Sequence, residues 1–80
     1  MTGQELVLIT SRDCHLCGHG RDALARCGLD AREIDVDSEE AQALANAGAP
    51  LSFLPVLLDG TRIVAYGRFS EKRLRKELAL

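Results

Sequence analysis

Two cysteines three positions apart, Cys14 and Cys17, are the residues of this 80-residue chain best suited to chemistry. A C-x-x-C pair can form a reversible disulfide, hold an iron-sulfur cluster or bind zinc, and the spacing alone does not choose between these uses. Its position narrows the choice, because the apolar run of residues 6–9 and a short polar turn precede the pair and a helical pattern follows it. A C-x-x-C pair where a strand passes into a helix favours thiol-disulfide chemistry.

The two cysteines are expected to play unequal roles. The thiolate is the nucleophile in disulfide exchange, and a free cysteine with a pKa of about 8.5 is mostly protonated at neutral pH. We expect a helix to begin at Cys14, where unpaired backbone amides and the helix dipole favour the thiolate, so that Cys14 attacks. Cys17, one turn further along the same helix face, would then resolve a mixed disulfide. Arg12 and protonated His15 would favour the Cys14 thiolate, whereas Asp13 would oppose it.

A proline at the start of an apolar strand is the second unusual feature. Residues 55–58 have the pattern of a short buried strand, and Pro55 is its first residue. Proline is rarely found in central strands because it lacks an amide hydrogen. A cis Leu54-Pro55 bond would explain the position, although only about 5 to 6% of X-Pro bonds in folded proteins are cis. The C-x-x-C pair in the same chain strengthens this expectation.

The elements that must position these residues alternate between strands and helices. Consecutive apolar residues at 6–9 are typical of a central strand covered on both faces. Apolar residues then recur every three or four positions up to Gly28, which predicts a helix over residues 14–27. Residues 32–37 alternate between apolar and acidic side chains, as in a half-solvated edge strand.

The second half of the chain contains another helix and a hairpin. Asp37-Ser38 can cap a second helix that ends at Gly48. The Asp59-Gly60 dipeptide is the strongest short hairpin signal, and it joins residues 55–58 to a partner strand over residues 61–66.

The last helix is expected to begin after Ser70. Phe69 and Leu74 occupy the two positions of a hydrophobic staple around that cap, and Leu78 follows on the same face. The predicted order is therefore β-α-β-α-β-β-α. A right-handed β-α-β unit followed by a hairpin and a closing helix is a compact α/β arrangement.

Length and composition exclude several classes of protein. With a formal net charge of -2 and 46% hydrophobic residues, the chain is expected to form one globular domain over residues 1–80, neither disordered nor strongly basic. No apolar run approaches the length that a bilayer requires, and the first residues lack the pattern of an export signal. We therefore expect no nucleic-acid or membrane partner. We also expect the protein to be a monomer.

The cysteine count indicates a reducing compartment. Three cysteines cannot all pair within one chain, and a structural disulfide framework normally uses an even number in a secreted protein. A cytoplasmic location is therefore expected. The third cysteine, Cys27, follows Leu24 at helical spacing and is expected to be a small buried core residue. Tyr66, at the end of a predicted strand, is likewise expected to be a packing residue.

Charges are unevenly distributed along the chain. The middle is acidic, with Glu33, Asp35, Asp37, Glu39 and Glu40, and the last helix is basic, with Arg68, Lys72, Arg73, Arg75 and Lys76. Two solvated faces are the ordinary interpretation, and a weakly polarised surface for protein docking is the alternative. Nucleic-acid binding would require interleaved aromatic residues or a known module, and the sequence has neither.

These motifs together resemble a glutaredoxin of the thioredoxin-fold superfamily, over essentially the whole chain. The resemblance is carried by the strand before Cys14-His15-Leu16-Cys17, then Leu54-Pro55-Val56, Asp59-Gly60 and Gly67. Gly67-Arg68-Phe69 before the last helix is similar to a short Cys-His-Leu-Cys variant family whose roles are largely unassigned. The resemblance implies a glutaredoxin-type thioredoxin-like fold with a four-stranded mixed sheet flanked by helices.

The resemblance also implies how a substrate would bind. Leu54, before the cis-proline, would present its backbone to glutathione or a peptide as a short antiparallel bridge. Arg12 matches the basic residue near the first cysteine, and Gly67 matches part of a Gly-Gly segment for the γ-glutamyl end of glutathione. Tyr66 replaces the other glycine of that segment. The aspartate that would follow it and bind the glutathione amino group is absent here. Arg68 could meet a substrate carboxylate.

The expected function is thiol-disulfide exchange through Cys14 and Cys17, which would reduce protein disulfides or glutathione mixed disulfides. His15-Leu16 stands where glutaredoxins typically carry Pro-Tyr, a departure that favours a protein disulfide as the substrate. No bound cofactor or metal is expected, and glutathione is a possible co-substrate, with glutathione or a reductase as electron donor. The alternatives are an iron-sulfur or zinc-binding module and a non-catalytic thioredoxin-like partner domain.

Overall fold

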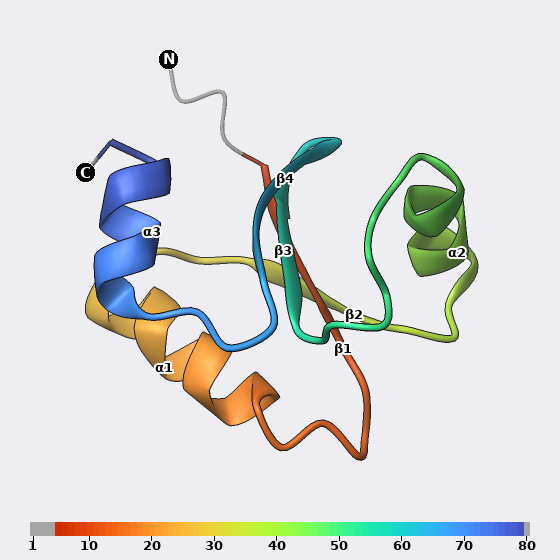
Figure 1. Cartoon of the computed structure of the whole chain (residues 1–80), viewed down its shortest axis with the longest axis horizontal. Coiled ribbons are helices and arrows are strands. Elements are labelled where there is room, and N and C mark those ends of the chain that lie inside the picture. The colour runs from red at the N-terminus through yellow and green to blue at the C-terminus, as the bar shows by residue number, and fades with distance from the viewer. Residues whose placement is uncertain (1–4, 80) are drawn as a thin grey trace.

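The computed structural model describes residues 5–79 (Figure 1). Strands and helices follow one another as β1 (Leu6–Thr10), α1 (Cys17–Arg26), β2 (Arg32–Asp35), α2 (Glu39–Asn46), β3 (Val56–Asp59), β4 (Arg62–Tyr66) and α3 (Glu71–Glu77). This order confirms the predicted β-α-β-α-β-β-α arrangement. None of the helices within residues 5–79 is both long and apolar enough to cross a bilayer.

The strands form one mixed sheet in the order β2-β1-β3-β4. β1 pairs with β2 in parallel and with β3 in antiparallel, and β3 pairs with β4 in antiparallel. All of β1 is buried, as expected for a central strand covered on both faces, whereas β2 at the edge is mostly exposed. The alternating residues of β2 and the apolar residues of β1 thus predicted the position of each strand.

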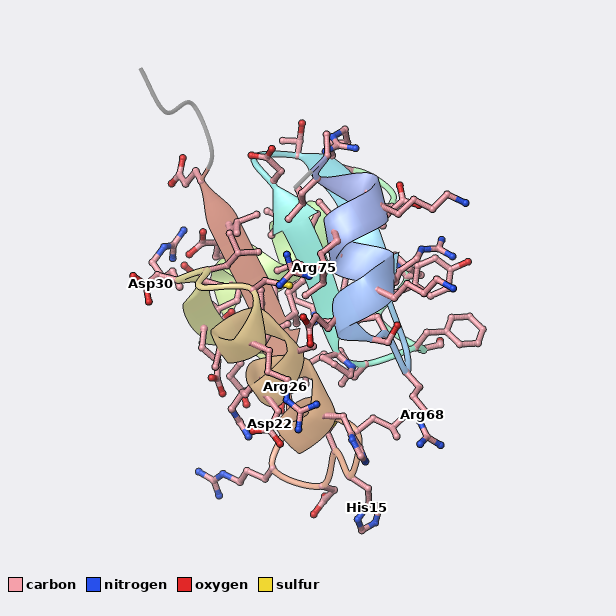
Figure 2. All side chains as sticks on the ribbon, turned by 90° about the vertical axis from the view of Figure 1, so that its left-hand side faces the viewer. His15, Asp22, Arg26, Asp30, Arg68 and Arg75 are labelled. Carbon is pink, nitrogen blue, oxygen red and sulfur yellow. A yellow bond between two sulfur atoms is a disulfide. The ribbon has the colours of Figure 1, made fainter. Side chains whose placement is uncertain are left out.

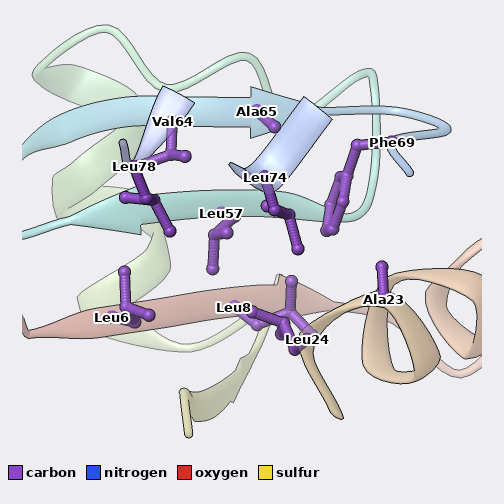
Figure 3. Packing of buried hydrophobic residues seen from close by; sticks show 10 residues of the cluster. All are labelled: Leu6, Leu8, Ala23, Leu24, Leu57, Val64, Ala65, Phe69, Leu74 and Leu78. Atoms are coloured by element: carbon purple, nitrogen blue, oxygen red, sulfur yellow. The ribbon is translucent and has the colours of Figure 1, made fainter. Parts of the chain in front are cut away.

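The helices divide between the two faces of the sheet. In Figure 1, α1 and α3 cover one face and α2 covers the other. The larger core lies beneath α1 and α3 (Figure 3) and consists of Leu6, Leu8, Ala23, Leu24, Leu57, Val64, Ala65, Phe69, Leu74 and Leu78. The smaller cluster lies beneath α2 and consists of Ile9, Ala41, Val56 and Leu58, with half-buried residues packed around them.

The predicted caps of α2 and α3 are confirmed. The Ser38 hydroxyl accepts a hydrogen bond from the Ala41 amide at 3.1 Å, and the Ser70 hydroxyl accepts one from the Arg73 amide at 3.2 Å. Each serine satisfies an amide that the first helical turn leaves without a backbone partner. Leu74 is fully buried in the larger core, as its place in the hydrophobic staple predicts.

The predicted start of α1 and the predicted end of β2 are wrong by two residues or more, and β3 begins at Val56 and not at Pro55. α1 begins at Cys17 and not at Cys14, because residues 11–14 close a turn in which the Cys14 amide donates to the Ser11 carbonyl at 3.3 Å. β2 ends at Asp35 and not at residue 37. The Asp35 carbonyl accepts a hydrogen bond from the Ser38 amide at 3.0 Å, and the Asp35 carboxylate accepts one from the Asp37 amide at 2.8 Å. These two bonds turn the chain away from the sheet.

Candidate redox site

Cys14 and Cys17 form a disulfide, with their Cα atoms 5.5 Å apart. Cys14 lies in the loop after β1, and Cys17 is the first residue of α1. Their exposure differs, because Cys17 is 1% exposed whereas Cys14 is only half-buried. Cys14 is therefore the more accessible of the two residues, and Cys17 is enclosed by the protein.

The later start of α1 changes how the helix can act on Cys14. Cys14 is outside the helix, so its own amide is not one of the free amides of the first turn, contrary to expectation. Its sulfur is nevertheless bonded to that of Cys17, and so it lies at the positive end of the α1 dipole. The predicted stabilisation of a thiolate therefore depends on contact with the helix terminus, which the loop of residues 11–16 provides.

An open groove runs beside Cys14, and we call it the redox groove. Its lining residues are Ser11, Asp13, Cys14, His15, Leu16, Leu51, Ser52 and Leu54. The fold thus brings His15 and Leu54, both predicted to contact substrate, to the same groove as Cys14. Within residues 5–79 the backbone N–H and C=O of Leu54 have no hydrogen-bonding partner, so an extended peptide can pair with them.

The loop before β3 is held in place by Gly67. The Leu54-Pro55 bond is cis, as predicted, and Pro55 is buried. The Gly67 amide donates to the carbonyl of Phe53 at 2.7 Å and to that of Pro55 at 2.9 Å. Gly67 has a φ of 68°, a conformation that favours glycine. Its amide is thus used to position Leu54, and Gly67 supports the groove without lining it.

The two arginines that were predicted to bind substrate lie outside this groove. Arg12 lines a separate hollow with Ser11, Asp13, Asp35 and Asp37. Arg68 lines one hollow with Tyr66 and residues of α3 and a second one with Asp22 and Glu71. The side chains of Arg68 and His15 nevertheless project from the same end of the molecule (Figure 2). The mainly acidic hollow adjoins the groove beside Cys14, because Ser11 and Asp13 line both, whereas the basic surface shares no lining residue with that groove.

An exposed aromatic pair next to the groove was missed by the sequence analysis. Tyr66 and Phe53 are 51% and 57% exposed, and their ring centroids are 5.6 Å apart. The prediction that Tyr66 is a packing residue is therefore wrong. A register shift between β3 and β4 buries Val64 and Ala65 in succession and leaves Tyr66, the last residue of an edge strand, pointing outward. An aromatic residue two positions before Pro55 was the available signal.

Gly20 lets α1 approach the cis-proline loop closely. A Cβ atom at this position would lie 3.1 Å from both a Pro55 ring carbon and a Phe69 ring carbon. Cys27, at the other end of α1, is only half-buried and packs against the edge of the larger core, so the prediction of a buried core residue is correct only in part. Its sulfur lies 3.8 Å from the Glu71 carbonyl oxygen.

Charge pairs on the β2 side stabilise structure away from the groove. The Arg21 guanidinium donates to Glu33 at 3.0 Å and holds the pKa of that carboxyl below its usual range, while burial opposes the shift and a hydrogen bond from Thr10 supports it. Arg32 pairs with Glu40 and likewise lowers its pKa. Among the residues described, no group of three or more His, Cys, Asp or Glu side chains is placed to hold a metal ion.

Comparison with known structures places this geometry in a fold class. The protein is similar to the crystal structure of a glutaredoxin from Archaeoglobus fulgidus, with a TM-score of 0.64 and 22% sequence identity over 94% of this chain and 86% of that chain. No protein-family model matches the sequence, and no curated protein sequence matches it either. The chain therefore has the glutaredoxin-type thioredoxin fold that its motifs predicted.

Proposed function

We propose that this protein is a dithiol oxidoreductase that reduces disulfides of protein substrates through Cys14 and Cys17. The observation that carries the proposal is the unequal exposure of the two cysteines beside a groove with a free backbone edge at Leu54. Disulfide exchange needs one sulfur that a substrate can reach and a second that reacts only within the protein.

In the reduced protein, the Cys14 thiolate attacks one sulfur of the substrate disulfide. A mixed disulfide forms, and the other substrate sulfur leaves as a thiolate that takes a proton from water. The Cys17 thiolate then attacks the Cys14 sulfur and expels the second substrate sulfur as a thiolate, which also takes a proton from water. The substrate thereby gains two electrons, and the protein is left with the Cys14–Cys17 disulfide. Because Cys17 is buried next to Cys14, this second step is intramolecular and is favoured over release by an outside thiol.

Backbone pairing at Leu54 would orient the substrate for this attack. An extended peptide that adds to the free edge at Leu54 gains main-chain hydrogen bonds without regard to its side chains. His15, exposed in the same groove, would contact the substrate next to the reacting sulfurs. The fold therefore supplies a binding edge and a reactive sulfur in one groove.

A protein disulfide suits this groove better than glutathione does. The chain has Tyr66 where a glycine is expected for the γ-glutamyl end of glutathione, and the Ser70 side chain caps α3 where a carboxylate would be needed. The exposed Phe53–Tyr66 pair offers apolar contact area that a small polar tripeptide cannot fully use. Glutathione, or another small thiol, remains suitable as the reductant that regenerates the dithiol, and we propose a reducing, cytoplasmic setting for the reaction.

Single-turnover reduction of two substrates tests the proposal. Pre-reduced wild type, Cys14→Ser, Cys17→Ser and, as a control, Cys27→Ser are mixed with a peptide disulfide or a glutathionylated peptide. We expect loss of reaction with Cys14→Ser, a trapped mixed disulfide through Cys14 with Cys17→Ser, and wild-type rates with Cys27→Ser. Reduction of the glutathionylated peptide that persists in Cys17→Ser would favour a monothiol route. Absence of any trapped species would exclude the dithiol mechanism.

A further inference from the structure

A second groove lies along the end of β4 and the exposed side of α3. Residues of both signs of charge occur on this part of the chain, but the described residues that line the groove include no carboxylate. The charged and aromatic residues that line it are Tyr66, Arg68, Phe69, Lys72, Arg73 and Lys76. We call this surface the basic groove.

Three of these cations are available to a ligand. Arg73 pairs with Glu77 at 3.2 Å, whereas Arg68, Lys72 and Lys76 form no ion pair with any residue among 5–79. Lys72 and Lys76 are one helical turn apart, so their charges repel each other on the same side of α3. An anionic group bound between them would remove this repulsion.

The stacked pair of Phe53 and Tyr66 lies between the basic groove and the redox groove. Tyr66, at one end of the basic groove, stacks against Phe53 with their ring centroids 5.6 Å apart. Phe53 is followed by Leu54, which lines the redox groove. The Gly67 amide ties the two segments together through its bonds to the carbonyls of Phe53 and Pro55. A polypeptide that leaves Leu54 can therefore cross the aromatic pair and enter the basic groove.

The opposite side of the redox groove would repel the same ligand. The hollow beside Arg12 is lined by three aspartates, Asp13, Asp35 and Asp37. An acidic segment is thus attracted on the α3 side and repelled on the β2 side, so only one direction of binding is favourable.

We propose that the basic groove binds an acidic segment of the protein substrate, next to an apolar residue that packs on Phe53 and Tyr66, and thereby holds the substrate disulfide at Cys14. This inference rests on the proposed disulfide exchange and adds the class of substrate: a protein with an acidic stretch beside its reducible disulfide. The reaction at the sulfurs is unchanged, with two electrons passing from the Cys14 and Cys17 thiols to the substrate disulfide.

Two peptides test this inference. They share one disulfide-bonded core, and one carries a run of glutamates beside it where the other carries glutamines. The pre-reduced protein, freed of dithiothreitol, is mixed with an excess of either peptide at low salt, and its oxidation is followed by acid quench and mass spectrometry. The measured quantity is the ratio of second-order rate constants, acidic over neutral.

We expect wild type to react roughly 3- to 10-fold faster with the acidic peptide, because solvent-exposed ion pairs each add a small increment. Lys72→Gln/Lys76→Gln should bring the ratio close to one. The matched control, Arg62→Gln/Arg75→Gln, removes the same net charge from exposed residues outside the groove, and its ratio should stay near that of wild type. Salt at 1 M, where the Debye length is about 3 Å, should abolish the preference of wild type.

A wild-type ratio of one, or an equal fall of the ratio in both double variants, would overturn the inference, the latter because it would mean attraction by net charge alone. The salt series uses wild type alone, so it tests the electrostatic origin of the preference even if a variant folds poorly. A preference for the acidic peptide that persists in 1 M salt would also contradict the inference. Failure of wild type to reduce either peptide would instead contradict the proposed disulfide exchange, so the two failures are distinguishable.

Discussion

The two edges of the sheet use their charges differently. At the edge formed by β2 and α2, ion pairs join neighbouring elements, in the pairs Arg21–Glu33 and Arg32–Glu40. At the edge formed by β4 and α3, the ion pairs Arg73–Glu77 and Arg75–Glu71 lie within α3 itself. Three further cations at that edge, Arg68, Lys72 and Lys76, have no ion-pair partner among residues 5–79. Packing differs as well, since α3 and its C-cap residue bury Leu74 and Leu78 in the larger core, whereas Ala41 is the only residue within α2 that is fully buried.

This difference separates structural charges from charges that are free to bind. α3 is held by apolar burial, so its cations need not contribute to its attachment and can serve a ligand. β2 is short and mostly exposed, and ion pairs supplement the little apolar area that it buries. The acidic run in the middle of the chain and the basic run of the last helix both read as solvated faces in the sequence, yet their charges have different uses at the two edges.

The largest expected effect comes from removing the apolar attachment of α3. Leu74→Ala should lower the free energy of unfolding by about 2–5 kcal/mol, because it leaves a cavity in the larger core. Leu44→Ala, on a half-buried residue of α2, should cost only about 1 kcal/mol. Urea denaturation followed by circular dichroism measures both. Equal losses would mean that the two helices are attached in the same way, contrary to the comparison.

An added methyl group at Gly20 should have the next largest effect. Gly20→Ala places a carbon 3.1 Å from Pro55 and Phe69 and should cost about 1–3 kcal/mol through overpacking on the α3 side. Gly18→Ala is the matched control, because its Cβ would meet no atom within 4 Å. That variant should be neutral or slightly more stable, since alanine favours the helix. Thermal unfolding of both variants separates tight packing from helix propensity.

Breaking a charge pair at the β2 edge should have a smaller effect. Arg21→Gln should lower the free energy of unfolding by about 0.2–1 kcal/mol, the usual range for exposed ion pairs. Lys72→Gln on α3 has no such partner among residues 5–79 and should leave stability unchanged or slightly higher. If both changes cost the same, the distinction between paired and free charges would not hold.

The smallest effect is a dependence on pH in acid. Because Arg21 lowers the pKa of Glu33, the stability that this carboxylate contributes is fully present above the ordinary glutamate pKa of about 4.3 and is lost as the pH falls through the lower folded value. The difference in unfolding free energy between wild type and Glu33→Gln should therefore stay constant from neutral pH down to about pH 5 and shrink below it. A difference that instead grows in acid would contradict the direction of the shift.

The sequence predicted most of the fold because most of its signals are local. Serines at helix starts, the Asp59-Gly60 turn and the apolar run of β1 each specify backbone structure within a few residues. The cis Leu54-Pro55 bond was also predicted, from a proline at the start of a strand. The start of α1 was misplaced because a turn of residues 11–14 satisfies the Cys14 amide before the helix begins.

The sequence by itself determined the chemistry available to this protein, namely a C-x-x-C pair after a buried strand, and the order of elements that carries it. The tertiary structure alone decided how far each cysteine is buried, that Phe53 and Tyr66 stack at the surface, and which charges have no ion-pair partner among residues 5–79. The physical reason is distance along the chain. Periodicity and capping act over a few residues, whereas exposure and pairing depend on contacts such as Gly20 with Pro55, which arise only when the sheet and helices have packed.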